Sequence, residues 1–259
     1  PVASLPENFD EDRAIDLIGR GVASLMGLET ALAALKAAQT GPGRAGWRPA
    51  AARPPRATRM LDEAEGKALL DAASVPIPKG IIGATLVEAR EKAQGLTPPL
   101  VLKGLGFAHK TEAGAVRLGL TTLDGQAEMA GATGYLVEEM VAAPVAEILL
   151  GLRRDPVYGA TLTLGLGGVT AELLADTVTL VLPVGGDEVL EAMKRLKLWP
   201  LLDGYRGRPR ADMAAVAGIA IRLGQLMIDR PELEEIEINP ILVRESGAVA
   251  VDALIREAV

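Results

Sequence analysis

Residues 99–120 read PLVLKGLGFAHKTEAGAVRLGL, and they predict a strand, a loop and a second strand. The first five residues predict a buried strand that ends in Lys103, and residues 115–120 predict a second strand. The glycine-rich loop between them carries His109, the single histidine of the chain. A lysine at a strand end, a glycine-rich loop and an imidazole together suit the handling of phosphate, although a lone histidine is more often an ordinary surface or core residue. The flanking sequence has to decide between these two interpretations.

Helices and strands alternate on both sides of this hairpin. Asp62-Glu63-Ala64-Glu65 is a capping-box-like start for a helix that reaches Ala73, and Thr85 opens a second helix. Further elements are predicted downstream: a short helix at 126–130, strands at 135–139, 145–152, 161–164, 177–182, 235–238 and 248–252, and helices at 187–197 and 211–229. Strand meanders between helical layers indicate an α+β fold rather than a doubly wound parallel sheet.

The first sixty residues differ in character from the rest. Residues 12–39 predict a helix at 12–20, a short strand at 21–25 and an Ala/Leu-rich helix at 28–39, too little to bury a core alone. We therefore expect residues 1–40 to be the tail of a preceding domain. Residues 41–59 are rich in Pro, Gly, Ala and Arg without hydrophobic periodicity, which predicts a linker. The main domain is then expected at residues 60–259.

Composition excludes several classes of function. The formal charge is −7, which argues against a general nucleic-acid or anionic-membrane binder. There are no cysteines, so disulfides and thiolate metal sites are excluded and a reducing, cytoplasmic location is expected. No uncharged apolar run approaches the ~18 residues of a membrane span. The N-terminus lacks a starting Met and a signal-peptide pattern, so we expect a piece of a longer chain.

A set of oxygen-bearing side chains gathers near the C-terminus. Glu235, Glu237 and Asn239 share one face of a predicted strand at period two, and Asp252 ends the strand after it. Carboxylate and amide oxygens suit Mg²⁺, which takes a few protein oxygens together with nucleotide phosphates. The alternative is a solvated acidic edge.

Other candidates are individually ambiguous. Lys103 suits a nucleotide phosphate, or is a strand-end lysine that extends to solvent. Gly165–Gly168 follows a strand, where glycines let backbone N–H groups approach phosphate or simply form a tight turn. Arg153 and Arg154 could bind a transferring phosphoryl group or pair with Asp155.

Taken together in chain order, residues 61–257 resemble the ATP-grasp domain of the NDP-forming acyl-CoA synthetases. That family includes ADP-forming acetate–CoA ligase and is related to the succinyl-CoA synthetase beta subunit. The matching blocks are LDEAEGKALL with VPIP, VLK, HKTEAGAVRL, LVEEMV, AEILLG, RRDP, LGLGGV, GYRGRP, EIEINPILV and VAVDA. The resemblance implies an ATP-grasp fold, in which two α/β subdomains clasp a nucleotide, preceded by the end of a CoA-ligase domain.

The resemblance also implies a role for each matching residue. Lys103 would contact the nucleotide phosphates, Glu147 the ribose or ATP, and Arg154 the transferring phosphate. The strand that ends in Glu138, Glu139 and Met140 would hold adenine through its backbone, and the loop with Gly167 and Gly168 would lie over the phosphate. Asn239 and Asp252 match Mg²⁺ ligands, with Glu237 close by. His109 aligns with a histidine that carries phosphate to a second histidine upstream.

The implied activity is that of an ADP-forming acid–CoA ligase: a carboxylate, CoA and ATP give acyl-CoA, ADP and phosphate. ATP/ADP and Mg²⁺ would bind in this chain, CoA and the carboxylic acid in the upstream domains, with an oligomer as the expected state. One alternative is an ATP-grasp regulatory or binding module of a protein acetyltransferase-type fusion, without ligase activity. Another is an ATP-grasp ligase of amino acids or peptides, which would not need the HKT loop.

Overall fold

The computed structural model describes residues 2–4, 10–39, 47–107, 114–142, 144–168 and 176–259. They form two compact units, Pro1–Arg48 and Pro49–Val259. The boundary between these units falls inside the predicted linker. Each unit is therefore described by itself.

The described residues of the first unit form two short parallel strands and two helices. Strands β1 (Val2–Ser4) and β2 (Ser24–Met26) pair in parallel. Helix α1 (Glu11–Gly19) begins after Asp10, whose carboxylate accepts hydrogen bonds from two backbone N–H groups of the first turn. Helix α2 (Leu28–Gln39) matches its predicted limits. The strand lies at 24–26 rather than 21–25, since Gly21 has a positive φ of 77° and belongs to the turn that ends α1.

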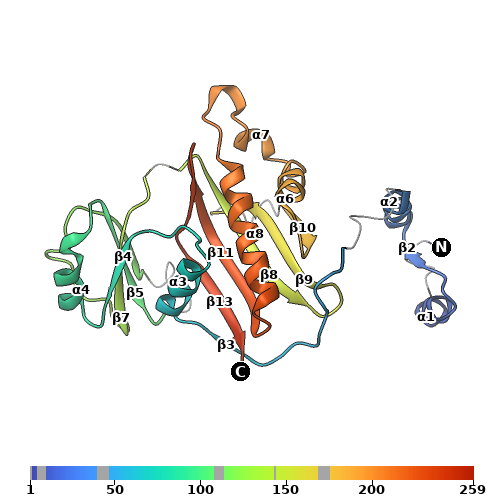
Figure 1. Cartoon of the computed structure of the whole chain (residues 1–259), viewed down its shortest axis with the longest axis horizontal. Coiled ribbons are helices and arrows are strands. Elements are labelled where there is room, and N and C mark those ends of the chain that lie inside the picture. The colour runs from blue at the N-terminus through green and yellow to red at the C-terminus, as the bar shows by residue number, and fades with distance from the viewer. Residues whose placement is uncertain (1, 5–9, 40–46, 108–113, 143, 169–175) are drawn as a thin grey trace. The chain divides into compact units, whose positions relative to one another are not determined.

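The second unit contains a small antiparallel sheet with the strand order β4-β7-β5-β6 (Figure 1). Its core is made by leucine, valine and alanine side chains of these strands and of helix α4, and it includes the buried Ala115. Thr85 accepts a hydrogen bond from the Glu88 N–H and so caps α4, as its sequence predicts. The elements are β4 (Gly80–Gly83), α4 (Leu86–Lys92), the 3-10 turn η2 (Ala93–Gly95), β5 (Leu100–Leu105), β6 (Val116–Leu120) and β7 (Gly134–Glu139).

The short helix predicted at residues 126–130 is wrong, because the structure has turns and irregular backbone there. The Met129 N–H donates to the Tyr135 hydroxyl at 2.9 Å instead of to a helical carbonyl. A helix of five residues would have to repay its nucleation cost with very few hydrogen bonds. The buried Tyr135 therefore decides the local conformation.

A larger antiparallel sheet has the order β10-β9-β8-β11-β13-β3, with β12 also paired to β11. Helices α6 and α8 contribute to the hydrophobic core on one face of this sheet (Figure 1). None of the helices within the described ranges is both long and apolar enough to cross a membrane. The strands are β3 (Thr58–Met60), β8 (Ala146–Asp155), β9 (Gly159–Leu166), β10 (Thr177–Val181), β11 (Leu233–Val243), β12 (Ala248–Ala250) and β13 (Ala253–Ala258).

The helices of this part are α3 (Glu63–Ala72), α6 (Gly186–Met193), α7 (Trp199–Leu202), the 3-10 turn η3 (Tyr205–Gly207) and α8 (Met213–Asp229). The predicted capping box of α3 is confirmed: the Asp62 carboxylate accepts from the Glu65 N–H, and the Glu65 carboxylate accepts from the Asp62 N–H. Helix α6 ends four residues before the predicted Lys197.

Strand β11 is longer than predicted, and β13 was not predicted at all. Residues 239–243 continue β11 past Asn239-Pro240, where the pairing with β8 shifts register. An Asn-Pro pair is typical of turns, and proline cannot donate to a ladder, so the sequence predicted an end at Ile238. The register shift accommodates the proline within the sheet. Pairing with β8 on one side and β13 on the other then sustains the longer strand.

The residues just before β3 bind to the large-sheet part of the molecule. The Ala50 N–H donates to the Leu182 carbonyl at 3.1 Å. Arg53 and Arg56 both pair with Glu234, at 2.8 and 2.9 Å. The second half of the predicted linker is therefore held along the domain surface by its arginines.

Candidate functional site

The predicted metal-binding residues lie on two neighbouring strands of the large sheet. The Asn239 N–H donates to the Asp252 carbonyl at 3.2 Å, so β11 and the residue that precedes β13 run side by side. Alternation along β11 places Glu237 on the same face as Asn239. Burial raises the pKa of Glu237 above its ordinary value, and the negative charges of Glu235 and Asp252 raise it further. Glu235 and Asp252 are therefore near enough to Glu237 for their charges to act on its carboxylate.

These residues suit a divalent cation that shares its coordination with a second ligand. Asn239, Asp252 and Glu237 offer only oxygen donors, as Mg²⁺ prefers. Within the described ranges, no three His, Cys, Asp or Glu side chains are grouped closely enough to hold a metal ion by themselves. The set fits Mg²⁺ whose remaining ligands are phosphate oxygens and water, and it does not form a closed protein cage.

Glu147, Gly167 and Gly168 come together at the neighbouring end of β8. The Gly167 N–H donates to the Glu147 carbonyl at 2.8 Å. Gly168 has a φ of 73°, and a Cβ there would collide with the Glu147 carboxylate. Glu147 also faces Leu242 of β11, three residues beyond Asn239. The predicted ribose contact and the start of the predicted phosphate loop therefore lie beside the part of β11 that follows Asn239.

Lys103 sits in a buried ionic cluster close to Asp252. Its ammonium group donates to the carbonyl of Val251 at 2.6 Å, which places it one residue from Asp252. Burial opposes the charged form, but the charges of Glu63, Glu138 and Asp252 more than offset this and raise the pKa of Lys103. The lysine therefore keeps its positive charge next to the candidate metal ligands.

Glu138 is the carboxylate at the centre of this cluster. It lies on β7, is 2% exposed, and pairs with Lys67 at 2.6 Å and with Lys103 at 2.8 Å. The Lys103 ammonium also contacts Glu63 at 3.1 Å. Sequence reasoning recognised Glu63 only as part of a helix cap and missed Lys67 altogether. Their i, i+4 spacing, which places both side chains on one face of α3, is the signal that could have found them.

At the strand end expected to bind adenine, two backbone N–H groups already donate hydrogen bonds within the protein. The Glu139 N–H donates to Lys79 and the Met140 N–H to Pro99, at 2.9 and 2.8 Å. The carboxylate of Glu139 accepts from the Thr97 N–H, and this hydrogen bond lowers the pKa of Glu139. The N–H groups of Glu139 and Met140 are thus used within the fold. Any adenine contact through a backbone N–H would have to come from residues after Met140.

Arg154 is placed away from the other predicted site residues, contrary to expectation. It shares the core face of β8 with Leu150 and Leu152, whereas Arg153 lies on the opposite face, across from Glu235. The Arg154 guanidinium donates to the carbonyls of Leu233 at 2.6 Å, Arg230 at 3.1 Å and Met227. These carbonyls belong to the end of α8 and the turn into β11. The arrangement argues for a structural role at a helix C-terminus rather than contact with a transferring phosphate.

His109, the predicted phosphate carrier, lies outside the described residues. The ends of its loop are described: β5 ends at Leu105, and Ala115, just before β6, accepts a hydrogen bond from the Gly104 N–H at 2.8 Å. The predicted strands on either side of the loop are confirmed.

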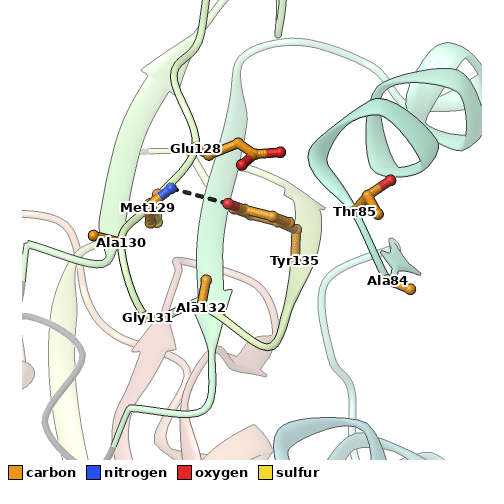
Figure 2. A pocket seen from close by; sticks show the side chains of 8 residues that line it. All are labelled: Ala84, Thr85, Glu128, Met129, Ala130, Gly131, Ala132 and Tyr135. Carbon is orange, nitrogen blue, oxygen red and sulfur yellow. Dashed lines mark hydrogen bonds between the residues drawn. The ribbon is translucent and has the colours of Figure 1, made fainter.

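A separate hollow of about 490 Å³ lies on the small-sheet part of the molecule (Figure 2). It is lined by Ala84, Thr85, Tyr135 and residues 128–132. None of the predicted site residues that the structure describes lines it, and its tyrosine hydroxyl already accepts from the Met129 N–H. The candidate chemistry therefore lies elsewhere, around Lys103, Asp252 and Asn239.

Comparison with known proteins identifies the fold. A family model described as an ATP-grasp domain matches residues 53–256. The beta subunit of ADP-forming acetate–CoA ligase I from Pyrococcus furiosus is 32% identical over 213 residues, which cover 75% of this chain and 90% of that protein. ADP-forming acetate–CoA ligase I from Archaeoglobus fulgidus is 32% identical over 204 residues. That match covers 73% of this chain but only 30% of the ligase.

A solved structure is similar over the same region. Dinucleotide-forming acetyl-coenzyme A synthetase 1 of Ca. Korarchaeum cryptofilum superposes with a TM-score of 0.68 at 29% identity, covering 76% of this chain and 92% of that one. That protein is in complex with coenzyme A and Mg-AMPPCP, and its phosphohistidine segment points towards the nucleotide binding site. The predicted ATP-grasp fold is confirmed by these matches.

Proposed function

Because the chain belongs to the ATP-grasp domain family, we propose that it is the ATP-binding, phosphoryl-transferring part of an ADP-forming acyl-CoA synthetase. The overall reaction converts a carboxylate, CoA and ATP into acyl-CoA, ADP and phosphate. The Pyrococcus relative is a beta subunit, and the match covers 90% of its length. This supports a separate ATP-binding part of the enzyme. The chain spans about 30% of the Archaeoglobus ligase, so the acyl and CoA steps belong to the remainder of such an enzyme.

The observation that carries the proposal is the meeting of a buried, charged lysine with Asp252, just before β13, and Asn239, in the middle of β11. Lys103 contacts the carbonyl of Val251 at 2.6 Å, beside Asp252, and Asp252 adjoins Asn239. Bound Mg²⁺ would supply positive charge to the phosphates, held here by Asn239 and Asp252 with Glu237 close by. Lys103 adds a fixed positive charge from the opposite, small-sheet side. Phosphoryl transfer depends mainly on positioning and on charge stabilisation of this kind.

The nucleoside end of ATP is assigned to the neighbouring residues. Glu147 offers a carboxylate to the ribose hydroxyls, and the Gly167–Gly168 turn covers the phosphates without side chains in the way. Since the N–H groups of Glu139 and Met140 are used within the fold, adenine is assigned to the backbone that follows Met140.

His109 is the proposed phosphate acceptor. An imidazole nitrogen attacks the γ-phosphorus, an N–P bond forms, and the bond to the β,γ-bridging oxygen breaks, so that ADP leaves with the electron pair. The phosphohistidine then passes the group to the acid-activating domain. The match of residues 109–118 to the family loop and the phosphohistidine segment of the Korarchaeum synthetase support this assignment.

Incubation of the full-length protein with γ-labelled ATP and Mg²⁺ tests the proposal. We expect acid-labile, base-stable label on the peptide that contains His109, located by mass spectrometry, and its loss in His109→Ala. Because a second histidine in the ligase domain also becomes labelled in such a relay, the modified peptide has to be mapped. A folded, Mg²⁺-loaded protein that binds no ATP would refute the enzyme assignment.

The proposed partners are CoA and a carboxylic acid, bound by a CoA-ligase domain or subunit, in an oligomeric assembly. Relatives that act on acetate support the acid and CoA steps. Acyl-CoA formation assayed with a series of acids would identify the substrate. ATP binding without acyl-CoA formation from any acid would favour the regulatory-module alternative.

A further inference from the structure

Four charged side chains from both sheet regions of the second unit are buried together. Glu63 and Lys67 come from α3, Lys103 from β5 and Glu138 from β7, and all four are at most 8% exposed. Their ion pairs span 2.6 to 3.1 Å. Two positive and two negative groups balance one another, so the cluster as a whole is neutral. Burial of charge at this depth is tolerated only with such pairing.

The Lys103 ammonium is fully engaged within this cluster. Its acceptors are Glu63, Glu138 and the carbonyl of Val251, at 3.1, 2.8 and 2.6 Å. An ammonium group has three protons, and three protein oxygens use them. A phosphate oxygen can therefore bind Lys103 only by sharing or replacing one of these partners. The strength of Lys103 as a phosphate ligand depends on how tightly its carboxylates hold it.

Lys67 weakens the attraction between Glu138 and Lys103, because it pairs with the same carboxylate. It occupies the Oε1 atom of Glu138 at 2.6 Å, while Lys103 contacts Oε2. Lys67 also approaches the Val251 carbonyl at 3.3 Å, so it lies beside Lys103 rather than behind Glu138. Burial lowers the pKa of Lys67, partly offset by the attraction of Glu138. Glu63 acts in the opposite sense, because its carboxylate competes directly with phosphate for Lys103.

We propose that Lys67 and Glu63 are positioning residues that set the affinity of Lys103 for the nucleotide phosphates by fixing the net charge of this buried cluster. The inference rests on the proposed function, since it assumes that ATP binds beside Lys103. Lys67 neutralises Glu138 and makes Lys103 available, whereas Glu63 limits how strongly Lys103 attracts anions. Neither residue has to touch the substrate.

Charge-changing variants of the full-length protein test this with Mg-ATP as the titrated ligand. Lys67→Met gives the cluster a net charge of −1 and is expected to raise the Kd about tenfold, since a unit charge in a poorly screened site acts strongly on a polyanion. Glu63→Gln gives +1 and is expected to lower the Kd, by roughly threefold. The double variant returns the cluster to neutrality and should bind within about twofold of the wild type.

Opposite changes of Kd in the two single variants, and a Kd near the wild-type value in the double variant, distinguish an effect of charge from an effect of packing. A purely structural role predicts that both single variants weaken binding and that the double variant is worse. We also expect KM for ATP to follow Kd while kcat changes less. Lys194→Met, which removes an exposed ion pair with Glu191, is the matched control and should leave Kd unchanged.

Folding is checked first by thermal unfolding, and Lys67→Gln replaces Lys67→Met if the latter is unfolded. Single variants that shift Kd in the same direction, or a double variant that shows no rescue, would overturn the inference. Failure of the wild type to bind Mg-ATP would instead overturn the proposed function, so the two failures are distinguishable.

Discussion

Arg154→Met tests directly whether this arginine is structural or catalytic. The substitution keeps an apolar side chain of moderate length but removes a guanidinium that donates to Leu233, Arg230 and Met227. A hydrogen bond from a charged donor is worth about 1.5–3 kcal/mol. Two of the three contacts share one nitrogen and are not additive, so we expect a loss of about 3 kcal/mol in the free energy of unfolding. That corresponds to a fall in Tm of roughly 6–12 °C for a domain of this size.

The variant is expected to be less stable because of where the Arg154 guanidinium lies. Two of the lost carbonyl partners, Met227 and Arg230, lie at the end of α8, where a cation is also favoured by the helix dipole, and the third, Leu233, begins β11. Burial lowers the pKa of Arg154 from its ordinary value, yet the side chain stays charged and its hydrogen bonds offset the cost of desolvation. The arginine therefore joins α8 to the start of β11.

Thermal unfolding by circular dichroism measures the change in stability, and single-turnover formation of ADP at a low temperature measures phosphoryl transfer. Arg153→Met is the matched control, because its side chain is exposed on the other face of the same strand. We expect this control to change stability by less than about 1 kcal/mol. An Arg154→Met protein that unfolds at the wild-type temperature but no longer transfers phosphate would refute the structural assignment and restore the catalytic one.

Three further outcomes are expected. The pKa of Glu237 is higher in the folded than in the unfolded protein, so its charged form destabilises the fold at neutral pH, and this destabilisation disappears as the pH falls through the folded-state pKa. Glu237→Gln should therefore have a higher free energy of unfolding in urea at neutral pH, and this free energy should no longer gain the contribution that the wild type gains when Glu237 is protonated. Gly168→Ala should raise KM for ATP by displacing Glu147, in addition to a cost of about 1–2 kcal/mol for its positive φ. Gly119→Ala is the control, because Gly119 has a similar φ but open space around it, so this variant should lose stability without a change in KM for ATP. If the two variants have the same KM for ATP, Gly168→Ala does not act by displacing Glu147. Asp252→Asn should weaken Mg-ATP binding more than about tenfold in calorimetry, whereas metal-free ATP binding should not weaken, because the variant removes a negative charge close to Lys103. Equal losses with and without metal would exclude Asp252 as a ligand.

Local sequence patterns were sufficient wherever one segment decides its own structure. The capping box at Asp62, the cap at Thr85 and the strands on both sides of the His109 loop are confirmed, because a few neighbouring residues satisfy their backbone groups. The order of the motifs along the chain was needed to recognise the family, because each motif is ambiguous when taken alone. The match of the ATP-grasp family model to residues 53–256 confirms that recognition.

Local patterns failed where a distant partner decides the outcome. Asn239-Pro240 is typical of a turn, yet pairing with β8 and β13 carries β11 through it. The short segment before Gly131 has a helical composition, but the buried Tyr135 takes one of its backbone donors. In both places the competing interaction comes from elsewhere in the fold.

The family and most of the helices and strands could be inferred from the sequence, because helix caps, strand periodicity and motif order are properties of neighbouring positions. The packing of the folded chain settles which face of the sheet is covered and which charges meet. Arg153 and Arg154 are equivalent in composition, but alternation along β8 sends one to the open face and the other beneath α8. Lys67 and Glu138 are 71 positions apart, and their 2.6 Å contact exists only because the fold brings the side chains of α3 within reach of β7. Electrostatic energy depends on distance in space, which sequence separation does not encode.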